Sequence, residues 1–220
     1  MKPVKHAPAA LALLASFALA GASAAAFTLA PDLAAPVLAE DAPVPTTAVI
    51  ASAKAARAGK QAPEAVFSDA EGKPVALADL LEKGPVVLIF YRGGWCPYCV
   101  KQLKAFEDQR ESIEAAGGRI VAVSTELPEF TAKTREKNKL GFEVLSDPGA
   151  KASRAFGVAW ANARYGPGLA KYQGNDKGEI PLGVTYVIDP EGTIRWAYLE
   201  DDYKKRATPQ QAIDALNEIE

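Results

Sequence analysis

The chain contains two cysteines, and they stand close together as Cys96-Pro97-Tyr98-Cys99. Cysteine becomes a nucleophile when it ionises to the thiolate. Two cysteines at this spacing can form a disulfide with each other and be reduced again. The spacing therefore predicts a redox-active pair, in which we expect Cys96 to attack first and Cys99, the more buried thiol, to act second.

The elements around this pair support a reactive site. An apolar run at 86–91 predicts a strand buried on both faces, and residues 92–95 predict a loop. A helix is expected from Pro97 to about Ala115, because apolar residues recur there at helical spacing and proline suits a first helical turn. The free N–H groups and positive dipole end of that helix are expected to lower the pKa of Cys96.

Two other uses of the cysteines remain open at this point. A structural disulfide is possible, although closing so short a loop stabilises a fold by only about 2 kcal/mol. A zinc half-site is the other, but structural zinc requires four ligands, and the chain has no further cysteine and a single histidine, His6. We therefore predict no metal and no cofactor.

Two neighbours of the pair are candidate substrate-binding residues. Arg92 stands four residues before Cys96, where it is predicted to support the thiolate or a developing oxyanion; the alternative is a solvated charge. Trp95 directly precedes Cys96 and is predicted to form, with Tyr98, a platform on which a partner protein docks. The alternative for both aromatic residues is ordinary packing.

The N-terminal residues resemble a targeting segment. Lys2 and Lys5 precede an apolar run at 9–20, and Ala22-Ser23-Ala24 fits a cleavage site. Residues 1–24 are thus predicted to be a signal peptide of an exported protein, periplasmic or secreted, with no stable membrane insertion after cleavage. An uncleaved anchor is the alternative. His6 lies in this segment, so the mature protein would lack histidine, which excludes Ser-His-Asp and Cys-His mechanisms.

The remaining sequence predicts a single domain from residue 59 to 220. An Ala/Pro-rich extension at 25–58 precedes it, and residues 48–57 of this extension could form a helix. The net charge of −2 gives no reason to expect nucleic-acid binding.

Strands and helices alternate, which predicts an α/β fold with a mixed central sheet and helices on both faces. Residues 159–180 lack a clear period and are expected to be a long loop or insertion. The other expected elements are a hairpin at 66–75, strands at 120–123, 142–145, 184–188 and 193–199, and helices at 78–82, 128–140, 150–156 and 209–219.

The segment from Phe90 to Cys99, FYRGGWCPYC, resembles the active-site segment of the peroxiredoxin-like branch of the alkyl hydroperoxide reductase and thiol-specific antioxidant superfamily. The resemblance covers about residues 59–217. It implies a thioredoxin-like fold and a thiol peroxidase that reduces hydroperoxides through a Cys96/Cys99 dithiol–disulfide cycle, with thioredoxin or a similar dithiol as the reductant. Further segments that support the resemblance are 59–63, 145–147, 156–158, 185–195, 202–203 and Arg206.

The sequence also departs from that family. Its members carry Pro-x-x-x-Thr/Ser-x-x-Cys. With Cys96 as the cysteine of this pattern, Ile89 stands in place of the proline and Gly93 in place of the Thr/Ser, so the hydroxyl that orients the peroxide is missing. The family's supporting arginine, expected near Gly183, is also absent. Two alternatives therefore remain: an exported thiol–disulfide oxidoreductase acting on protein disulfides, and a non-enzymatic exported domain with a structural disulfide.

Overall fold

The computed structural model describes residues 55–161, 166–175 and 177–219. All of them belong to one compact unit. The predicted signal peptide, most of the Ala/Pro-rich extension and most of the expected helix at 48–57 lie outside the described residues. Within the described part of the chain, no helix is long and apolar enough to cross a membrane.

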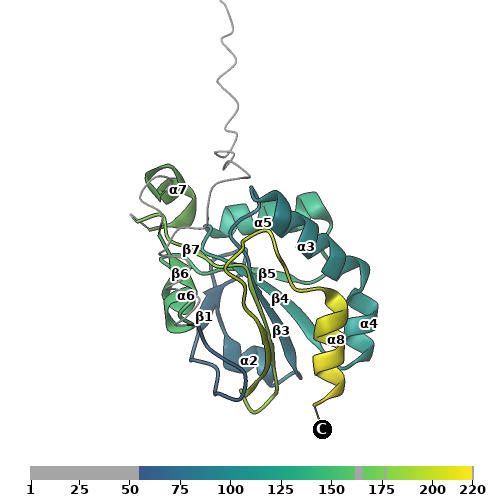
Figure 1. Cartoon of the computed structure of the whole chain (residues 1–220). Coiled ribbons are helices and arrows are strands. Elements are labelled where there is room, and N and C mark those ends of the chain that lie inside the picture. Colours follow the sequence, from purple (N-terminus) through teal and green to yellow (C-terminus); the bar gives the residue numbers. More distant parts are fainter. Residues whose placement is uncertain (1–54, 162–165, 176, 220) are drawn as a thin grey trace, which may run out of the picture. The chain divides into compact units, whose positions relative to one another are not determined.

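A mixed sheet of seven strands forms the centre of this unit, in the order β2-β1-β5-β4-β3-β8-β9 (Figure 1). The central strands β3, β4 and β5 run parallel, whereas β8 pairs with β3 and with β9 in antiparallel fashion. This confirms the predicted mixed sheet. The strands are β1 (Val66–Ser68), β2 (Pro74–Ala76), β3 (Val86–Phe90), β4 (Arg119–Ser124), β5 (Glu143–Ser146), β8 (Val184–Ile188) and β9 (Ile194–Tyr198).

Helices cover both faces of the sheet, as the alternation of side chains along β3 requires. Val87 and Ile89 point into a core shared with α3, α4 and α8, whereas Leu88 and Phe90 point into a core shared with α2 and α6. All five residues of β3 are fully buried, so the strand holds the following loop in place. The helices are α2 (Leu77–Leu81), α3 (Pro97–Asp108), α4 (Arg110–Ala115), α5 (Pro128–Asn138), α6 (Lys151–Ala155), α7 (Gly166–Gln173) and α8 (Pro209–Asn217).

The helix expected from Pro97 to Ala115 is divided into α3 and α4. Gln109 leaves the helical conformation, with φ −112° and ψ 14°, and separates the two. The apolar residues Leu103, Phe106 and Ile113 all reach the same core. They would also share one face of an unbroken helix, so their spacing carries no sign of the break.

The prediction of a long loop at 159–180 was wrong, because this segment contains α7 and a two-stranded antiparallel ribbon of β6 (Ala159–Trp160) and β7 (Ile180–Pro181). Leu169 and Tyr172 of α7 are buried, at 1% and 8% exposure. Strands of two residues are too short to show a period, and a helix that begins Gly-Pro-Gly has weak helix propensity. Tertiary contacts therefore decide this segment.

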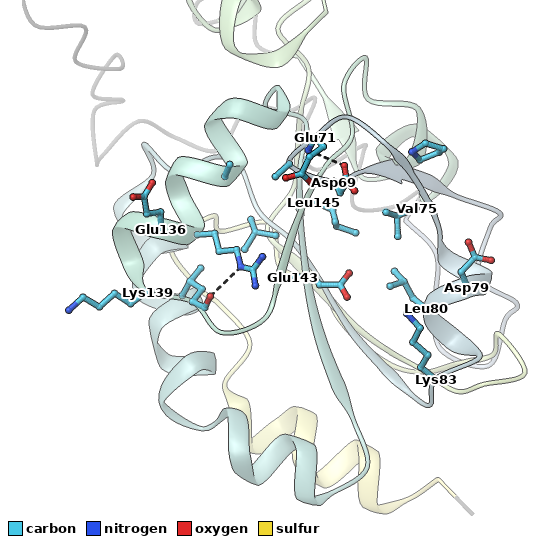
Figure 2. A pocket seen from close by; sticks show the side chains of 16 residues that line it. Asp69, Glu71, Val75, Asp79, Leu80, Lys83, Glu136, Lys139, Glu143 and Leu145 are labelled. Atoms are coloured by element: carbon cyan, nitrogen blue, oxygen red, sulfur yellow. Dashed lines mark hydrogen bonds between the residues drawn. The ribbon is translucent and has the colours of Figure 1, made fainter.

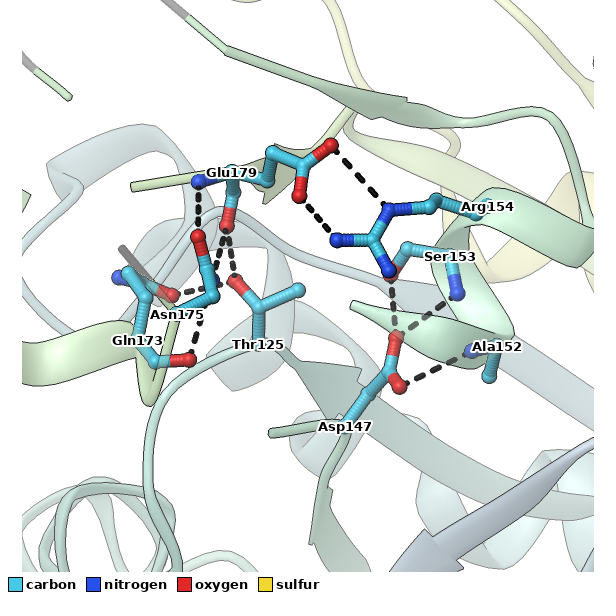
Figure 3. Close-up of polar contacts among 8 residues, drawn as sticks. All are labelled: Thr125, Asp147, Ala152, Ser153, Arg154, Gln173, Asn175 and Glu179. Carbon is cyan, nitrogen blue, oxygen red and sulfur yellow. Dashed lines mark hydrogen bonds and ion pairs between the residues drawn. The ribbon is translucent and has the colours of Figure 1, made fainter. Parts of the chain in front are cut away.

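Polar contacts tie this segment to the ends of the central strands (Figure 3). The Thr125 hydroxyl, just after β4, contacts the Gln173 amide oxygen and lies 2.8 Å from the carbonyl oxygen of Glu179. The Asn175 side chain accepts the Glu179 N–H at 2.8 Å, and Glu179 forms an ion pair with Arg154 of α6. These bonds connect residues 159–180, which we call the insertion, with the residues that directly follow the C-terminal end of β4.

Candidate active site

The cysteine pair lies where the sequence predicts it, at the junction of a central strand and a helix. Cys96 is the N-cap residue of α3, and Cys99 lies in its first turn. Both are free thiols, and both are buried, with exposures of 1% and 0%. The expected difference in burial between them is therefore absent, and any substrate must reach sulfur atoms that are closed to bulk solvent.

The two thiols differ in their protonation, and the difference is opposite to the prediction for Cys96. A hydrogen bond with Cys99, together with burial, raises the pKa of Cys96. Burial also raises the pKa of Cys99, but the hydrogen bond with Cys96 and the Arg206 and Arg92 guanidiniums outweigh it, so the net pKa is lowered. The start of α3 gives Cys96 little support, because Pro97 has no N–H and the backbone N–H of Cys99 is the smallest of the effects on the pKa of Cys96.

Arg92 is buried beside the pair rather than solvated, with 5% exposure. Its guanidinium carbon lies 4.6 Å from the ring centroid of Tyr203, 5.3 Å from that of Trp95 and 5.9 Å from that of Trp160. Cations over aromatic faces are attracted by the ring quadrupole. The three rings hold the charge of Arg92 next to the cysteines, and Tyr203 also packs edge-on against Tyr98 at 5.7 Å.

Arg206 is a site residue that the sequence analysis named only in support of the family resemblance and gave no role. It precedes α8, and its Nη2 atom lies 3.7 Å from Sγ of Cys99. Its guanidinium rests on Gly183, where a side-chain carbon would overlap the Cζ and Nη1 atoms of Arg206 and stand 2.8 Å from Nε. The guanidinium of Arg206 thus lies beside Gly183, the position near which the sequence lacks the expected arginine.

Glu126 is a second site residue that was missed. It is 3% exposed, and its Oε2 atom accepts the N–H of Gly94 at 2.9 Å. Burial raises the pKa of Glu126 to about 7, despite the hydrogen bond from Gly94 and with a smaller contribution from Cys99. The only sign in the sequence was its place just after a buried strand.

The loop before Cys96 packs so tightly around Glu126 that it requires glycine. Gly93 has φ +151°, and a side-chain carbon there would meet the indole of Trp95 and stand 2.9 Å from Oε1 of Glu126. A side-chain carbon at Gly94 would overlap the hydroxyl of Thr134. These contacts fix the loop that carries Arg92 and Trp95.

Trp95 is half-buried between the site and the surface. It packs against both core clusters, and it also lines a shallow groove of about 560 Å³ with Pro97 and Val100 of α3. Lys101 and Lys104 lie at the same groove. The groove begins at the cysteine loop and follows the outer side of α3.

A separate cavity of about 740 Å³ lies away from the cysteines, between the β1–β2 hairpin, α5 and β5 (Figure 2). Its charged residues, among them Asp79, Lys83 and Glu143, do not converge on a common point in Figure 2. None of the four predicted site residues lines it. Among the described residues there is also no cluster of histidine, cysteine or carboxylate side chains that could hold a metal ion.

Comparison with known proteins places this site in a family. The profile of the AhpC/TSA family matches residues 58–197. Peroxiredoxin Q, chloroplastic, of Sedum lineare is 31% identical over 156 residues, which are 71% of this chain and 73% of that protein. The protein of the same name from Gentiana triflora is 30% identical over 156 residues, 71% of this chain and 63% of that protein. The chain thus spans about two thirds of the length of these relatives.

Solved structures show the same fold. Peroxidoxin BcpB from Mycobacterium tuberculosis superposes with a TM-score of 0.61 at 24% identity, over 74% of this chain and 98% of that one. Reduced Prx3 from Vibrio vulnificus, solved in complex with hydrogen peroxide, gives 0.62 at 19% identity, over 73% and 98%. The predicted thioredoxin-like fold is confirmed.

Proposed function

The chain belongs to the AhpC/TSA family, and from that premise we propose that it is a thiol-dependent peroxidase whose Cys96 and Cys99 reduce hydroperoxides. One thiolate attacks the O–O bond, an alcohol or water leaves, and the sulfur is oxidised to a sulfenic acid. The second thiol condenses with the sulfenic acid, releasing water and forming the disulfide. An external dithiol then reduces this disulfide by exchange and is itself oxidised.

The observation that carries this proposal is the burial of the dithiol between two guanidiniums. Both sulfur atoms are closed to solvent, Arg206 lies 3.7 Å from one of them, and Arg92 is buried beside the pair. A hydroperoxide is small and leaves as an oxyanion, which buried cations stabilise. A disulfide on a folded protein is too bulky to reach these sulfur atoms in this conformation, so the arrangement favours peroxide over protein disulfides.

Thioredoxin, or a dithiol of similar kind, is the proposed reductant, and the groove beside Trp95 is its proposed docking site. The groove starts at the cysteine loop, and its wall combines the apolar Trp95, Pro97 and Val100 with two lysines and one aspartate, so its charged residues are net positive. A protein with an acidic, partly apolar surface complements such a wall. Reduction also requires the loop at Arg92 to open, because the disulfide would form below it.

Export remains part of the proposal, with residues 1–24 as signal peptide and 25–58 as an extension of the domain. Lysines, an apolar run and a small-residue cleavage site in succession support it. The mature N-terminus of the natively expressed protein tests it: sequencing should find a start close to Ala25, and an intact Met1 would contradict it.

Rapid mixing of the reduced protein with hydrogen peroxide tests the peroxidase activity. We expect a rapid change in tryptophan fluorescence, because Trp95 adjoins Cys96, and the loss of both thiols as each pair consumes one peroxide. The double variant Cys96→Ser with Cys99→Ser is the matched blank and should show neither change.

Oxidation no faster than that of a free thiol in solution would contradict the peroxidase. If the reduced protein then forms mixed disulfides with exported proteins, the thiol–disulfide oxidoreductase is the better description. If the disulfide resists reduction by physiological dithiols, with a potential well below about −300 mV, it is structural.

A further inference from the structure

The three aromatic rings around Arg92 differ in how firmly the fold holds them. Trp160 belongs to one of the two core clusters, and Trp95 packs against both. Tyr203 is half-buried and is a member of neither cluster. Its ring nevertheless makes the shortest of the three contacts, with its centroid 4.6 Å from the guanidinium carbon of Arg92. Tyr203 is therefore the ring that can leave Arg92 without disturbing either core.

The segment that carries Tyr203 has neither helical nor strand structure. It comprises residues 199–208, which we call the strap, and it connects β9 with α8 (Figure 1, yellow). A turn with Tyr203 and Lys204 at its centre is closed by the Lys205 N–H, which donates to the carbonyl oxygen of Asp202 at 3.0 Å. The Lys204 N–H donates to the carboxylate of Asp202 at the same distance. A turn of this size can move one side chain while the sheet stays in place.

Tyr203 and Tyr98 cover the cysteine pair on the side of the strap. Their rings pack edge-on with centroids 5.7 Å apart, and beneath them Cys96 is 1% and Cys99 0% exposed. Burial is the main cause that raises the pKa of Tyr203, and the charge of Cys96 also contributes, so the phenol and this sulfur lie close enough to interact. Neither cysteine lines the groove beside Trp95. A substrate that enters beneath the strap must therefore pass the ring of Tyr203.

We propose that Tyr203 determines which hydroperoxides reach the cysteine pair: it admits hydrogen peroxide and small alkyl hydroperoxides and excludes those with a bulky aromatic group. This rests on the peroxidase function proposed above. A small hydroperoxide requires only a slight displacement of the ring. A bulky one requires the ring to leave the guanidinium of Arg92 and the edge of Tyr98, and both contacts are attractive. Tyr203 thus acts on selectivity through its bulk and takes no part in the chemical step.

The selectivity is measured as the ratio of two second-order rate constants, for cumene hydroperoxide and for hydrogen peroxide, from stopped-flow fluorescence of the reduced protein. Wild-type protein should react much faster with hydrogen peroxide. Slow reaction with both substrates contradicts the peroxidase function itself, whereas equally fast reaction with both overturns the role of Tyr203 alone. A single group that fits or obstructs a pocket changes selectivity by about 10–200-fold. We therefore expect Tyr203→Ala to raise the ratio by at least about tenfold.

Three further variants separate the bulk of the ring from other effects. Tyr203→Phe keeps the ring and should keep the wild-type ratio, whereas the larger ring of Tyr203→Trp should lower it. Lys205→Ala is the matched control in the strap, because Lys205 is exposed and pairs with Glu200 at 3.8 Å, and it should leave the ratio unchanged. Circular dichroism verifies that each variant is folded. A folded Tyr203→Ala protein with the wild-type ratio, or an equal increase in Lys205→Ala, would overturn the proposal.

Thiol labelling tests the cover without any peroxide. The reduced proteins are treated with iodoacetamide, which is small, and with N-phenylmaleimide, which carries an aromatic ring. We expect Tyr203→Ala to accelerate labelling by N-phenylmaleimide more than labelling by iodoacetamide, and Tyr203→Phe to label like wild type. This result would support the cover even if the peroxidase function failed. Equal labelling of wild type and Tyr203→Ala by both reagents would show that Tyr203 does not close the site.

Discussion

At the scale of single residues, Glu126 is a described residue with a pKa near neutral pH. Its carboxyl group is buried beneath the loop that carries Arg92 and Trp95, and it holds that loop through the N–H of Gly94. An ionised carboxylate is costly to bury, so burial raises the pKa of Glu126 to about 7. The folded state therefore binds a proton that the unfolded state releases at lower pH.

This pKa predicts a pH dependence of stability. The stabilisation from protonated Glu126 is fully present below its unfolded pKa of 4.5 and is lost as the pH rises through about 7. The loss amounts to about 3 kcal/mol. Glu126→Gln keeps an oxygen acceptor for Gly94 but carries no charge, so its unfolding free energy relative to wild type should increase by that amount between about pH 5 and pH 8.

Urea unfolding of the reduced proteins at several pH values measures this difference. Glu129→Gln is the control, because Glu129 lies nearby at the start of α5 and is exposed. A difference between Glu126→Gln and wild type that stays constant with pH would show that Glu126 is not protonated in the folded protein near neutrality.

At the scale of elements, the connection between β9 and α8 completes the site. It carries Tyr203, which covers Arg92, and Arg206, which faces Cys99. Its far end is held by a capping box, in which Thr208 and Gln211 exchange hydrogen bonds at the start of α8. The capping box therefore positions Arg206, two residues before Thr208.

Thr208→Ala tests this element. Loss of an N-cap costs about 1 kcal/mol of stability, and fraying at the start of α8 should also loosen Arg206 and slow peroxide reduction. Thermal unfolding and stopped-flow fluorescence measure the two effects. Gln210→Ala is the comparison, because Gln210 is exposed in the same helix and bonds only Asp214. If Gln210→Ala matches Thr208→Ala in both measurements, the cap has no special role.

At the scale of the whole molecule, the insertion at 159–180 connects the end of the sheet with the site. Trp160 in β6 contributes one ring around Arg92, and the other end of the insertion is bonded to Thr125. Thr125 is fully buried, and its hydroxyl serves both the Gln173 side chain and the Glu179 carbonyl group. The position of the insertion thus depends on this one side chain.

Thr125→Val should release the insertion while leaving the sheet intact. It removes the hydroxyl from two buried acceptors, at a cost of about 1–3 kcal/mol. Hydrogen exchange should become faster at 166–180 than in β3 and β4. Thr131→Val is the matched control: Thr131 is also buried, but its hydroxyl bonds only Pro128 within α5. Uniformly faster exchange over the whole chain would argue against a separate insertion.

The sequence by itself determined the features that depend on neighbouring residues. The buried run of β3, the pair of cysteines and the first turn of α3 follow one another directly, so the redox pair and the strand–helix junction were predictable from spacing. The family, the thioredoxin-like fold and, with them, a thiol-dependent peroxidase are confirmed by the comparisons. Export and the identity of the reductant stay predictions.

Only the tertiary structure decided which charges surround the cysteines. Glu126 approaches Gly94 across 32 residues, and Arg206 approaches Cys99 across 107. No local pattern encodes such contacts, because they result from how β4 pairs with β3 and how α8 packs against β8 and β9. The prediction that Cys96 has the lowered pKa was wrong for this reason: it considered the start of one helix, whereas a thiolate is stabilised by every charge and donor that the whole fold brings within reach.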